Sequence, residues 1–379
     1  MKSLLLIICV SVPLFGSLLL PVFGRFSARL RNISAFAFIA CAFVCSALAL
    51  PVVIAGSPIS LHIELPLGLS FGLYADALAV FMAITSSFVA SVIALYSFGY
   101  IKEYENQNEY YMMISLFISA MMGLVYSTNL IYIYVFWEIS AVCCWRLIGF
   151  YREEITILRA NKAFLITVGG ALVMLAGFIG IYSETGTFDL TAMRGAHIPS
   201  WAVILILFGI LSKSATFPLH SWLPDAGVAP SPVTSLLHAA VLVKIGVYIY
   251  ARLFAVDFDI SPAFTVAVPV IAAVSALISA GAAMRELLDI AERQIRPRDE
   301  QRRKTMRHRP QPERRHCHVA GRIAALVHQG LYRIPHVHER RGVQGLVHVA
   351  VRMPLGHHGD PVELGVLAGE ADVRQPLRA

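Results

Sequence analysis

Charge is scarce in this sequence. Charged residues occupy 15% of its 379 positions, against 57% for hydrophobic residues, and the mean hydropathy is +0.67. A typical soluble domain carries roughly 25% charged residues, so this composition excludes a soluble protein of such length. The apolar residues fall in runs of about 20, which is the length needed to cross about 30 Å of hydrocarbon. The sequence therefore predicts an all-α, polytopic transmembrane helical bundle.

Motifs that hold cofactors and metals are also missing. The sequence has no P-loop, no Gly-x-Gly-x-x-Gly after a strand, no Cys-x-x-Cys cluster and no haem-attachment motif. Its six cysteines form no disulfide framework and are typical of small buried hydrophobic residues. His316-Cys317-His318 and the pair His357-His358 lack a matched second pair of ligands. We expect neither a metal nor a cofactor in this chain.

Aromatic residues almost disappear after Met284. The last 95 residues contain one aromatic residue, Tyr332, together with 17 arginines and nine of the 13 histidines. The whole net charge of +7 belongs to this tail, because residues 1–284 hold 13 basic and 13 acidic side chains. Such a segment cannot bury enough apolar surface to offset the entropy lost on ordering.

Two interpretations of residues 285–379 follow. The tail is disordered, or the reading frame is lost near residue 285, since a GC-rich gene translated out of frame has this composition. Arginine-rich tails can bind nucleic acid, but we expect no nucleic-acid partner here. Resequencing of the genomic locus separates the two interpretations: an intact frame with no further spans encoded downstream would contradict frame loss.

Nine apolar runs precede the tail, at about residues 3–22, 33–56, 73–98, 111–127, 129–150, 163–183, 202–222, 232–253 and 263–284. A cleaved signal peptide is the alternative for the first run, but that run is long and no A-x-A-like site follows it. Residues 57–72 contain Pro and Gly and roughly alternate, which favours a short hairpin or extended loop. We divide the chain into a two-helix region with this loop (1–72), a transmembrane core (73–284) and the tail (285–379).

Basic residues in the loops indicate an orientation. With the amino terminus outside, the loop residues on the cytoplasmic side are Arg25, Arg29, Arg31, Lys102, Arg152, Arg159 and Lys162. Lys2, Arg194 and Arg252 fall outside. By the positive-inside rule we expect a multi-pass protein of the cell inner (plasma) membrane with its N-terminus outside.

Two of the ionisable residues inside predicted spans lie near the middle of a span, where charge is costly and usually functional. Glu138 lies near the middle of the fifth span, and Lys213 about midway along the seventh. A lysine changes its protonation readily when buried. A buried lysine whose carboxylate partner approaches and retreats is thus a switchable proton site. The alternative is a purely structural Lys–Glu pair.

The eighth span carries His238 and Lys244. Six residues of helix separate them by about 9 Å along the axis and about 120° in direction, so water would have to bridge them. Histidine titrates near neutral pH and suits proton shuttling. This pattern favours a relay; the alternative is a hydrogen-bonded core histidine.

The seventh span is predicted to be broken. Pro218 lacks a backbone donor and disrupts a helix, and broken helices that line a cavity mark binding sites in transporters. His220 and Asp225 follow in the stretch HSWLPDA. We expect these three residues to act in gating; plain anchoring at the membrane interface is the alternative.

Three stretches carry a resemblance to a known family: NLIYIYVFWEISAVCCWRLIGFY, KSATFPLHSWLPDA and PSPVTSLLHAAVLVKIGVYIYAR. They resemble the proton-conducting, antiporter-like membrane subunits of respiratory complex I. That family includes the large Mrp-type cation/proton antiporter subunits and the membrane subunits of energy-converting hydrogenases and formate hydrogenlyase. The resemblance covers about residues 70–284. It implies that Glu138 tunes Lys213; by the same resemblance the proton passes on through His238 and Lys244.

The family fold implies about 14 helices with two inverted five-helix repeats. This chain resembles the first repeat and enters the second at its ninth span, and the second broken helix with its lysine is absent. We therefore expect a truncated version of that fold, with about nine spans and one broken helix.

The implied function is that of a proton-translocating membrane subunit of a redox-driven complex, of the NADH-quinone oxidoreductase or membrane-bound hydrogenase type. Quinone, flavin or iron–sulfur centres would lie only in partner subunits, and H⁺ or Na⁺ would be the ion carried. One alternative is an Mrp-type cation/proton antiporter subunit without redox enzymes. The other is a non-functional, truncated or frameshifted fragment.

Overall fold

The computed structural model describes residues 2–64, 70–307, 349–352 and 363–366. The chain divides into two compact units, Met1–Glu292 and Arg293–Ala379. The first unit begins with α1 (Lys2–Phe26), α2 (Ala28–Ile54), and the antiparallel hairpin of β1 (Ile59–Glu64) and β2 (Ser70–Ala75). The long helices α3 (Ala77–Tyr100), α4 (Gln107–Tyr126), α5 (Leu130–Ile148) and α6 (Glu154–Thr185) follow.

The remaining elements of the first unit are shorter and less regular. They are α7 (Ser200–Lys213), η2 (Leu219–Ser221), α8 (Trp222–Asp225), η3 (Ala226–Val228), α9 (Ser231–Thr234), the π-helical η4 (Ser235–Ala240), α10 (Leu242–Tyr250), the π-helical η5 (Ala251–Asp257) and α11 (Pro262–Arg307), which continues into the second unit. In the second unit, β3 (Val349–Arg352) pairs antiparallel with β4 (Glu363–Val366).

Eight helical segments among the described residues are long and apolar enough to cross a membrane, and α7 is a shorter apolar helix. The predicted polytopic helical bundle is therefore confirmed. The seventh helix, however, ends at Lys213 rather than at residue 222. The ring of a proline clashes with the carbonyl four residues earlier, so Pro218 stops the helix before Ser214.

The ninth span also differs from its prediction, because α11 continues past Met284 to Arg307 without a break. Arg and Glu supply 10 of the 23 residues from Arg285 to Arg307, and both have high helix propensity. The predicted disorder or frame loss at 308–348, 353–362 and 367–379 lies outside the described residues.

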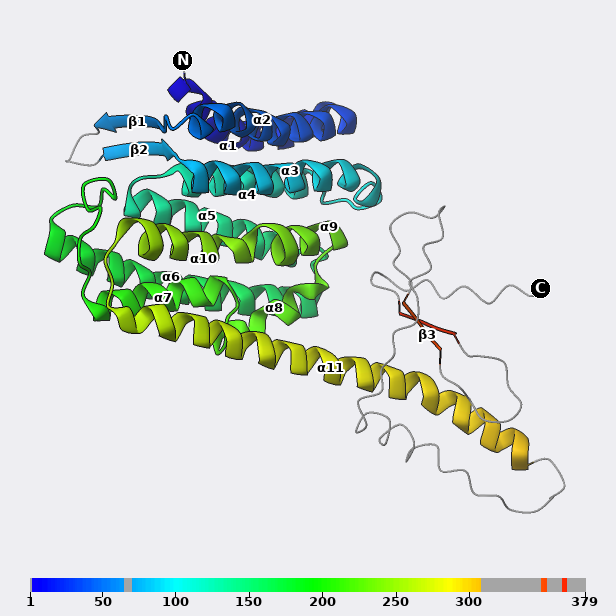
Figure 1. Ribbon diagram of the computed structural model, residues 1–379. Helices are drawn as coiled ribbons and strands as arrows, with labels where there is room; N and C mark the ends of the chain where they lie inside the picture. Colours follow the sequence, from blue (N-terminus) through cyan, green and yellow to red (C-terminus); the bar gives the residue numbers. More distant parts are fainter. Residues whose placement is uncertain (1, 65–69, 308–348, 353–362, 367–379) are drawn as a thin grey trace. The chain divides into compact units, whose positions relative to one another are not determined.

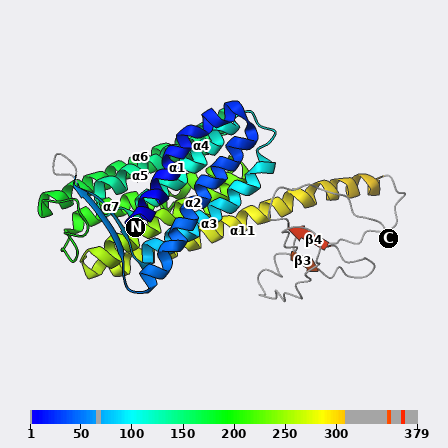
Figure 2. The ribbon, with the colours of Figure 1, turned by 90° about the horizontal axis from the view of Figure 1, so that it is seen from above.

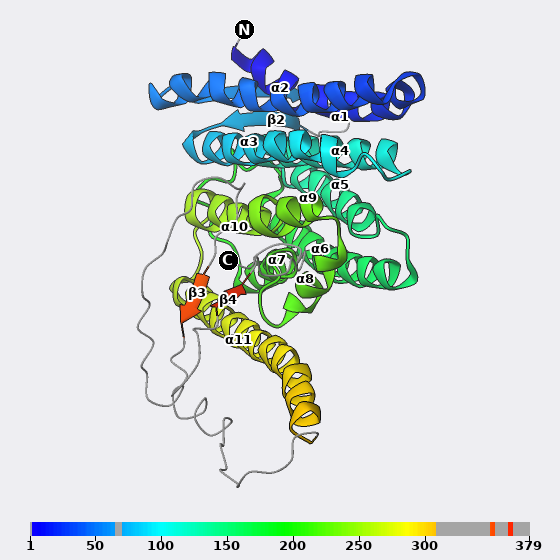
Figure 3. The ribbon, with the colours of Figure 1, turned by 90° about the vertical axis from the view of Figure 1, so that its right-hand side faces the viewer.

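The helices of the first unit pack in succession. α1 packs against α2 and α4, α2 against α3, α4 against α5, α5 against α6, and α6 against α7, while α10 packs against α7. Figures 1 and 3 show these pairs as successive layers, and Figure 2 shows α1 to α4 running side by side. Helices in lipid associate through close van der Waals packing rather than through hydrophobic burial.

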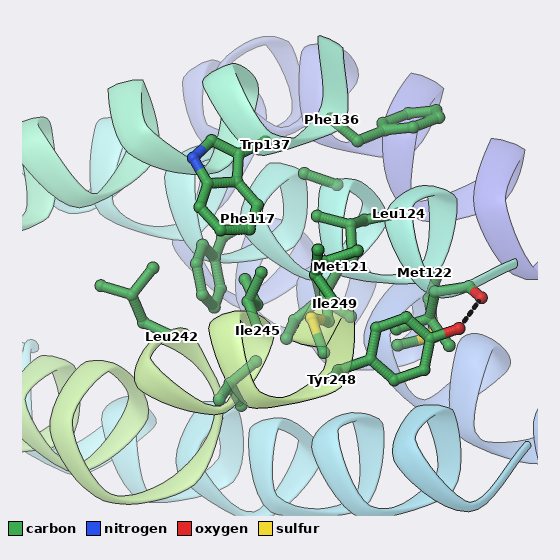
Figure 4. Close-up of a cluster of buried hydrophobic side chains, with 14 of the residues drawn as sticks. Phe117, Met121, Met122, Leu124, Phe136, Trp137, Leu242, Ile245, Tyr248 and Ile249 are labelled. Carbon is green, nitrogen blue, oxygen red and sulfur yellow. Dashed lines mark hydrogen bonds between the residues drawn. The ribbon is translucent and has the colours of Figure 1, made fainter. Parts of the chain in front are cut away.

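A buried apolar cluster anchors α10 to α4 and α5. Figure 4 shows Phe117 of α4, Trp137 of α5, and Ile245 and Tyr248 of α10 within this cluster. The hydroxyl of Tyr248 donates a hydrogen bond to the backbone oxygen of Val125. α10 is thereby held firmly between two irregular π-helical segments.

The close approach of α7 and α10 depends on Gly246. A methyl group added there would collide with the Ser214 hydroxyl and lie 2.9 Å from the Ile210 carbonyl oxygen, which belongs to the backbone. We expect Gly246→Ala to destabilise the protein by about 1–3 kcal/mol, the usual cost of overpacking. Thermal unfolding in detergent measures the effect. Gly99→Ala is the matched control, because nothing lies within 4 Å of that position; equal melting of both variants would contradict the prediction.

Candidate functional site

Lys213 is completely buried at the C-terminal end of α7, rather than midway along a span as predicted. Its ammonium donates hydrogen bonds to the Trp137 backbone oxygen at 2.8 Å and to Ser140 Oγ at 2.7 Å. The same nitrogen lies 4.8 Å from the centroid of the Trp137 ring. The last turn of a helix favours a positive charge, because its carbonyl groups carry partial negative charge. The backbone of Lys213 thus lies at the end of α7, while its ammonium reaches across to α5.

Glu138 lies on α5, next to Trp137 in sequence, and is partly buried. Its Oε1 atom is buried and has no hydrogen-bond partner. The charges of Glu138 and Lys213 influence one another. No ion pair within 4.0 Å joins these two described side chains, however. The structure brings the predicted pair within electrostatic reach and holds the two groups apart.

A small cavity borders Lys213. Its volume is about 10 Å³, close to the minimum that one water molecule needs. The lining includes Cys144 of α5, Thr167 of α6, Trp222 of α8 and Leu242 of α10. Four helical elements therefore meet around the lysine.

The backbone turns sharply after Lys213. Ala215 has φ +50°, a left-handed conformation that is uncommon for a residue with a Cβ. The indole nitrogen of Trp222 donates a 2.9 Å hydrogen bond to the Ser212 backbone oxygen, one of the carbonyls freed at the helix end. The backbone N–H of Phe217 donates to Ser275 Oγ of α11. These bonds fix the broken segment that carries Pro218.

Asp225 and His220, predicted as gating residues, have different surroundings. Lys162 of α6 pairs with Asp225 at 2.6 Å and also donates to the Ser221 backbone oxygen. His220 stacks obliquely on Phe217, and its Nδ1 is buried without a partner. The pair between Lys162 and Asp225 fastens α8 to α6 and leaves His220 free of polar partners within the described residues.

His238 and Lys244 do not point into one common environment. His238 lies in η4, and its Nε2 is buried without a partner. π-helical turns are frequent at functional sites. Lys244 lies on the exposed face of α10 in the described part of the chain. The structure thus places the histidine inside and the second lysine at the surface.

Five buried side-chain polar atoms among the described residues lack a hydrogen-bond partner: Trp137 Nε1, Glu138 Oε1, Ser214 Oγ, His220 Nδ1 and His238 Nε2. Buried polar groups are normally paired. These exceptions all belong to α5, to the segment after α7, or to η4. Unpaired donors and acceptors of this kind suit water-mediated proton transfer.

A second buried ionic cluster ties η5 to the start of α3. Arg252, predicted at the outer end of the eighth span, is buried and donates to both carboxylate oxygens of Asp76 at 2.7 and 2.8 Å, and to the Tyr248 hydroxyl. Asp76 also caps α3 by accepting from the Ala79 N–H. Burial alone would raise the pKa of Asp76, but the hydrogen bonds and charge of Arg252 outweigh it and lower that pKa below its ordinary value of 3.8.

Sequence reasoning missed three contributors to these sites: Ser140, Lys162 and the pair of Asp76 with Arg252. Asp76 carried a usable signal, because an aspartate directly before an apolar helix is a preferred N-cap. Ser140 carried none, since a serine within a span commonly bonds only to its own helix. Lys162 was assigned to a loop as a marker of orientation; its partner is 63 residues away in sequence.

Two known families match the sequence. Residues 127–290 match the family described as NADH:quinone oxidoreductase/Mrp antiporter, TM, and residues 63–111 match the N-terminus of chain 5 of NADH-ubiquinone oxidoreductase (complex I). Lys213, Glu138, His238 and Lys244 all lie within the first match.

Curated relatives include a Na⁺/H⁺ antiporter subunit from Alkalihalophilus pseudofirmus, which is 42% identical over 199 residues, 49% of this chain and 24% of the relative. Another Na⁺/H⁺ antiporter subunit, from Staphylococcus aureus, is 35% identical over 260 residues, 66% of this chain and 32% of the relative. This chain thus spans only about a quarter to a third of the length of the curated relatives it matches.

Two solved structures share the fold. A chain of the Mrp complex from Dietzia sp. DQ12-45-1b is 28% identical with a TM-score of 0.58, over 65% of this chain and 28% of that chain. A chain of the membrane-bound sulfane sulfur reductase, an archaeal respiratory membrane complex, is 24% identical with a TM-score of 0.61, over 66% of this chain and 53% of that chain.

Proposed function

The chain belongs to the family of antiporter-like membrane subunits of complex I and Mrp antiporters, and we propose that it is a proton-translocating subunit of a cation/proton antiporter complex. The observation that carries the proposal is the buried ammonium of Lys213 at the break after α7, within electrostatic reach of Glu138. An unpaired buried charge in a membrane helix is costly and persists where it serves ion or proton movement. The Na⁺/H⁺ antiporter relatives support Na⁺ as the ion whose movement is coupled to that of the proton.

The relay begins at Glu138 and Lys213. A nearby Glu138 carboxylate favours the ammonium of Lys213, so the approach and retreat of the two groups change how tightly Lys213 holds its proton. His238, whose Nε2 is buried without a partner, takes the next position. Lys244 lies on the exposed face of α10. We therefore place it last in the relay, where the proton leaves this chain. Pro218, His220 and Asp225 gate access from the other side of Lys213.

A redox-driven complex is the second candidate. The family descriptions that name NADH:quinone oxidoreductase support it. In that case the subunits that hold quinone, flavin or iron–sulfur centres would be partners of this chain. In both cases we propose a multi-pass protein of the plasma membrane with its N-terminus outside, assembled with other membrane subunits.

The fragment hypothesis concerns the residues after Met284. If the frame is lost there, tail peptides would still be translated, but the chain would lack the second inverted repeat with its broken helix and lysine. Mass spectrometry that detects peptides of residues 308–379 in assembled complexes would argue against a non-functional product.

Everted membrane vesicles, prepared from cells that carry the chain and its partner subunits at their own locus, test the function. With an imposed pH gradient, addition of Na⁺ should dissipate the gradient through the parent protein, and Glu138→Gln should reduce this response to background. Glu154→Gln is the matched control, because Glu154 is exposed at the start of α6. A gradient that forms on addition of NADH or hydrogen, without any response to Na⁺, would favour the redox-driven candidate. Unaltered Na⁺ response in Glu138→Gln would contradict the proposed relay.

A further inference from the structure

The partners of the Lys213 ammonium are all uncharged. They are the Trp137 backbone oxygen, the Ser140 hydroxyl and the face of the Trp137 ring. Glu138, the carboxylate of the predicted pair, is not among them. The ammonium therefore occupies a position built from dipoles and a π-face, although a carboxylate lies within electrostatic reach.

The hydrogen-bonding groups of this position suit the protonated lysine. The Ser140 hydroxyl donates its hydrogen to the Trp137 backbone oxygen at 2.6 Å. Only its oxygen lone pairs therefore remain for Lys213. A carbonyl oxygen is an acceptor only, and a hydroxyl whose hydrogen is already engaged is one too. An aromatic face likewise attracts a cation. A neutral amine would gain a donor for its lone pair only if the Ser140 hydroxyl turned away from the Trp137 oxygen.

The position lies on a different side of α5 from Glu138. Successive residues of an α-helix turn by about 100°, so Glu138 and Ser140 point in directions that differ by about 160°. The lysine side chain is long and flexible, with rotatable donors at its end. The ammonium can therefore leave the uncharged position for Glu138 only by moving around α5.

We propose that Ser140 is a positioning residue whose hydroxyl, together with the Trp137 carbonyl, forms an uncharged rest position that holds protonated Lys213 away from Glu138. The inference deepens the proposed proton-translocating function and rests on it. At rest the ammonium stays on Ser140, and we expect Glu138, which is partly buried and has no ion-pair partner, to be protonated. Transfer begins when the ammonium leaves Ser140 for Glu138 and the carboxyl proton of Glu138 passes to water as the ion pair forms.

Infrared spectroscopy of the complex that contains the full chain tests this arrangement. On exchange from H₂O to D₂O at constant neutral pH, a protonated carboxyl gives a shifted C=O band, and the band absent from Glu138→Gln identifies Glu138. We expect Ser140→Ala to move the partition of the ammonium toward Glu138 by about tenfold, the worth of one hydrogen bond to a charged group. The Glu138 acid band should then lose intensity relative to the parent protein.

Two controls accompany the measurement. Ser140→Thr keeps the hydroxyl and should keep the acid band. Ser119→Ala removes another fully buried hydroxyl, which donates to the Val10 backbone oxygen far from Lys213, and should also keep it. The cysteines near Lys213, Cys143 and Cys144, absorb outside the carboxyl region.

The outcomes separate this proposal from the proposed function. An unchanged Glu138 band in a folded Ser140→Ala protein would overturn the rest position, and so would a parent spectrum without that band. Loss of the band in Ser140→Ala would support it even if the vesicles showed no cation-driven proton movement, which would count against the transport function alone.

Discussion

Replacement of Lys213 by methionine is expected to abolish Na⁺-driven proton movement in everted vesicles while the protein remains folded. Methionine is of similar length and apolar, so it fills the buried space without an ionisable group. The two acceptors that Lys213 leaves remain bonded, since Ser140 donates to the Trp137 carbonyl. The loss should therefore be functional rather than structural.

Lys213→Arg separates the need for a charge from the need for a transferable proton. Arginine stays protonated in proteins, so we expect it to be as inactive as methionine. Lys102→Met is the matched control, because Lys102 is exposed in the loop between α3 and α4. Quantification of each variant in the membrane shows whether it assembles. Transport by either Lys213 variant at the level of the parent would show that this residue carries no proton.

Replacement of Asp76 by alanine is expected to destabilise the protein by about 3–5 kcal/mol, because it leaves a buried charge without its partner. Arg252 is only 4% exposed, and Asp76 provides both oxygens of a bidentate ion pair as well as the cap of α3. The double variant Asp76→Ala/Arg252→Met should recover much of that loss, since it removes the unpaired charge. Thermal unfolding in detergent measures all three proteins; equal stability of the single variant and the parent would contradict the prediction.

The same ion pair predicts a pH dependence. The pKa of Asp76 in the folded protein lies below its ordinary value of 3.8, so the folded state binds the proton less readily than the unfolded chain. The stabilisation is fully present above that ordinary value and is lost as the pH falls through the lower folded pKa. The stability difference between the parent and Asp76→Ala should therefore narrow below about pH 4. A difference that stays constant to lower pH would show that the ion pair is not its source.

The broken seventh helix shows how far sequence reasoning reached. Pro218 predicted a break, because a proline removes a donor and clashes with the preceding turn. The proline ring clashes with the carbonyl four residues earlier, that of Ser214, which explains why the helix ends at Lys213. The predicted span reached residue 222 because it was drawn from hydropathy alone. The lysine consequently lies at a helix end rather than mid-span.

The ionisable residues show the complementary limit. Glu138 and Lys213 were identifiable because charge is rare inside an apolar span. Their actual partners were not, since the acceptors of Lys213 lie on another helix, 73 and 76 residues away. The same holds for the pair of Arg252 with Asp76, which are 176 residues apart.

The stretch from Lys213 to Arg252 illustrates both halves of the result. The sequence by itself determined that this chain is a helical membrane protein, because apolar run length is a local property, and three of its stretches carry the resemblance to the antiporter-like family. Only the tertiary structure showed that Lys213 donates hydrogen bonds to Ser140 and the Trp137 carbonyl, that Lys244 is exposed, and that Arg252 is buried against Asp76. Those outcomes depend on how helices distant in sequence pack, and the direction of a side chain between helices is not encoded by any single segment.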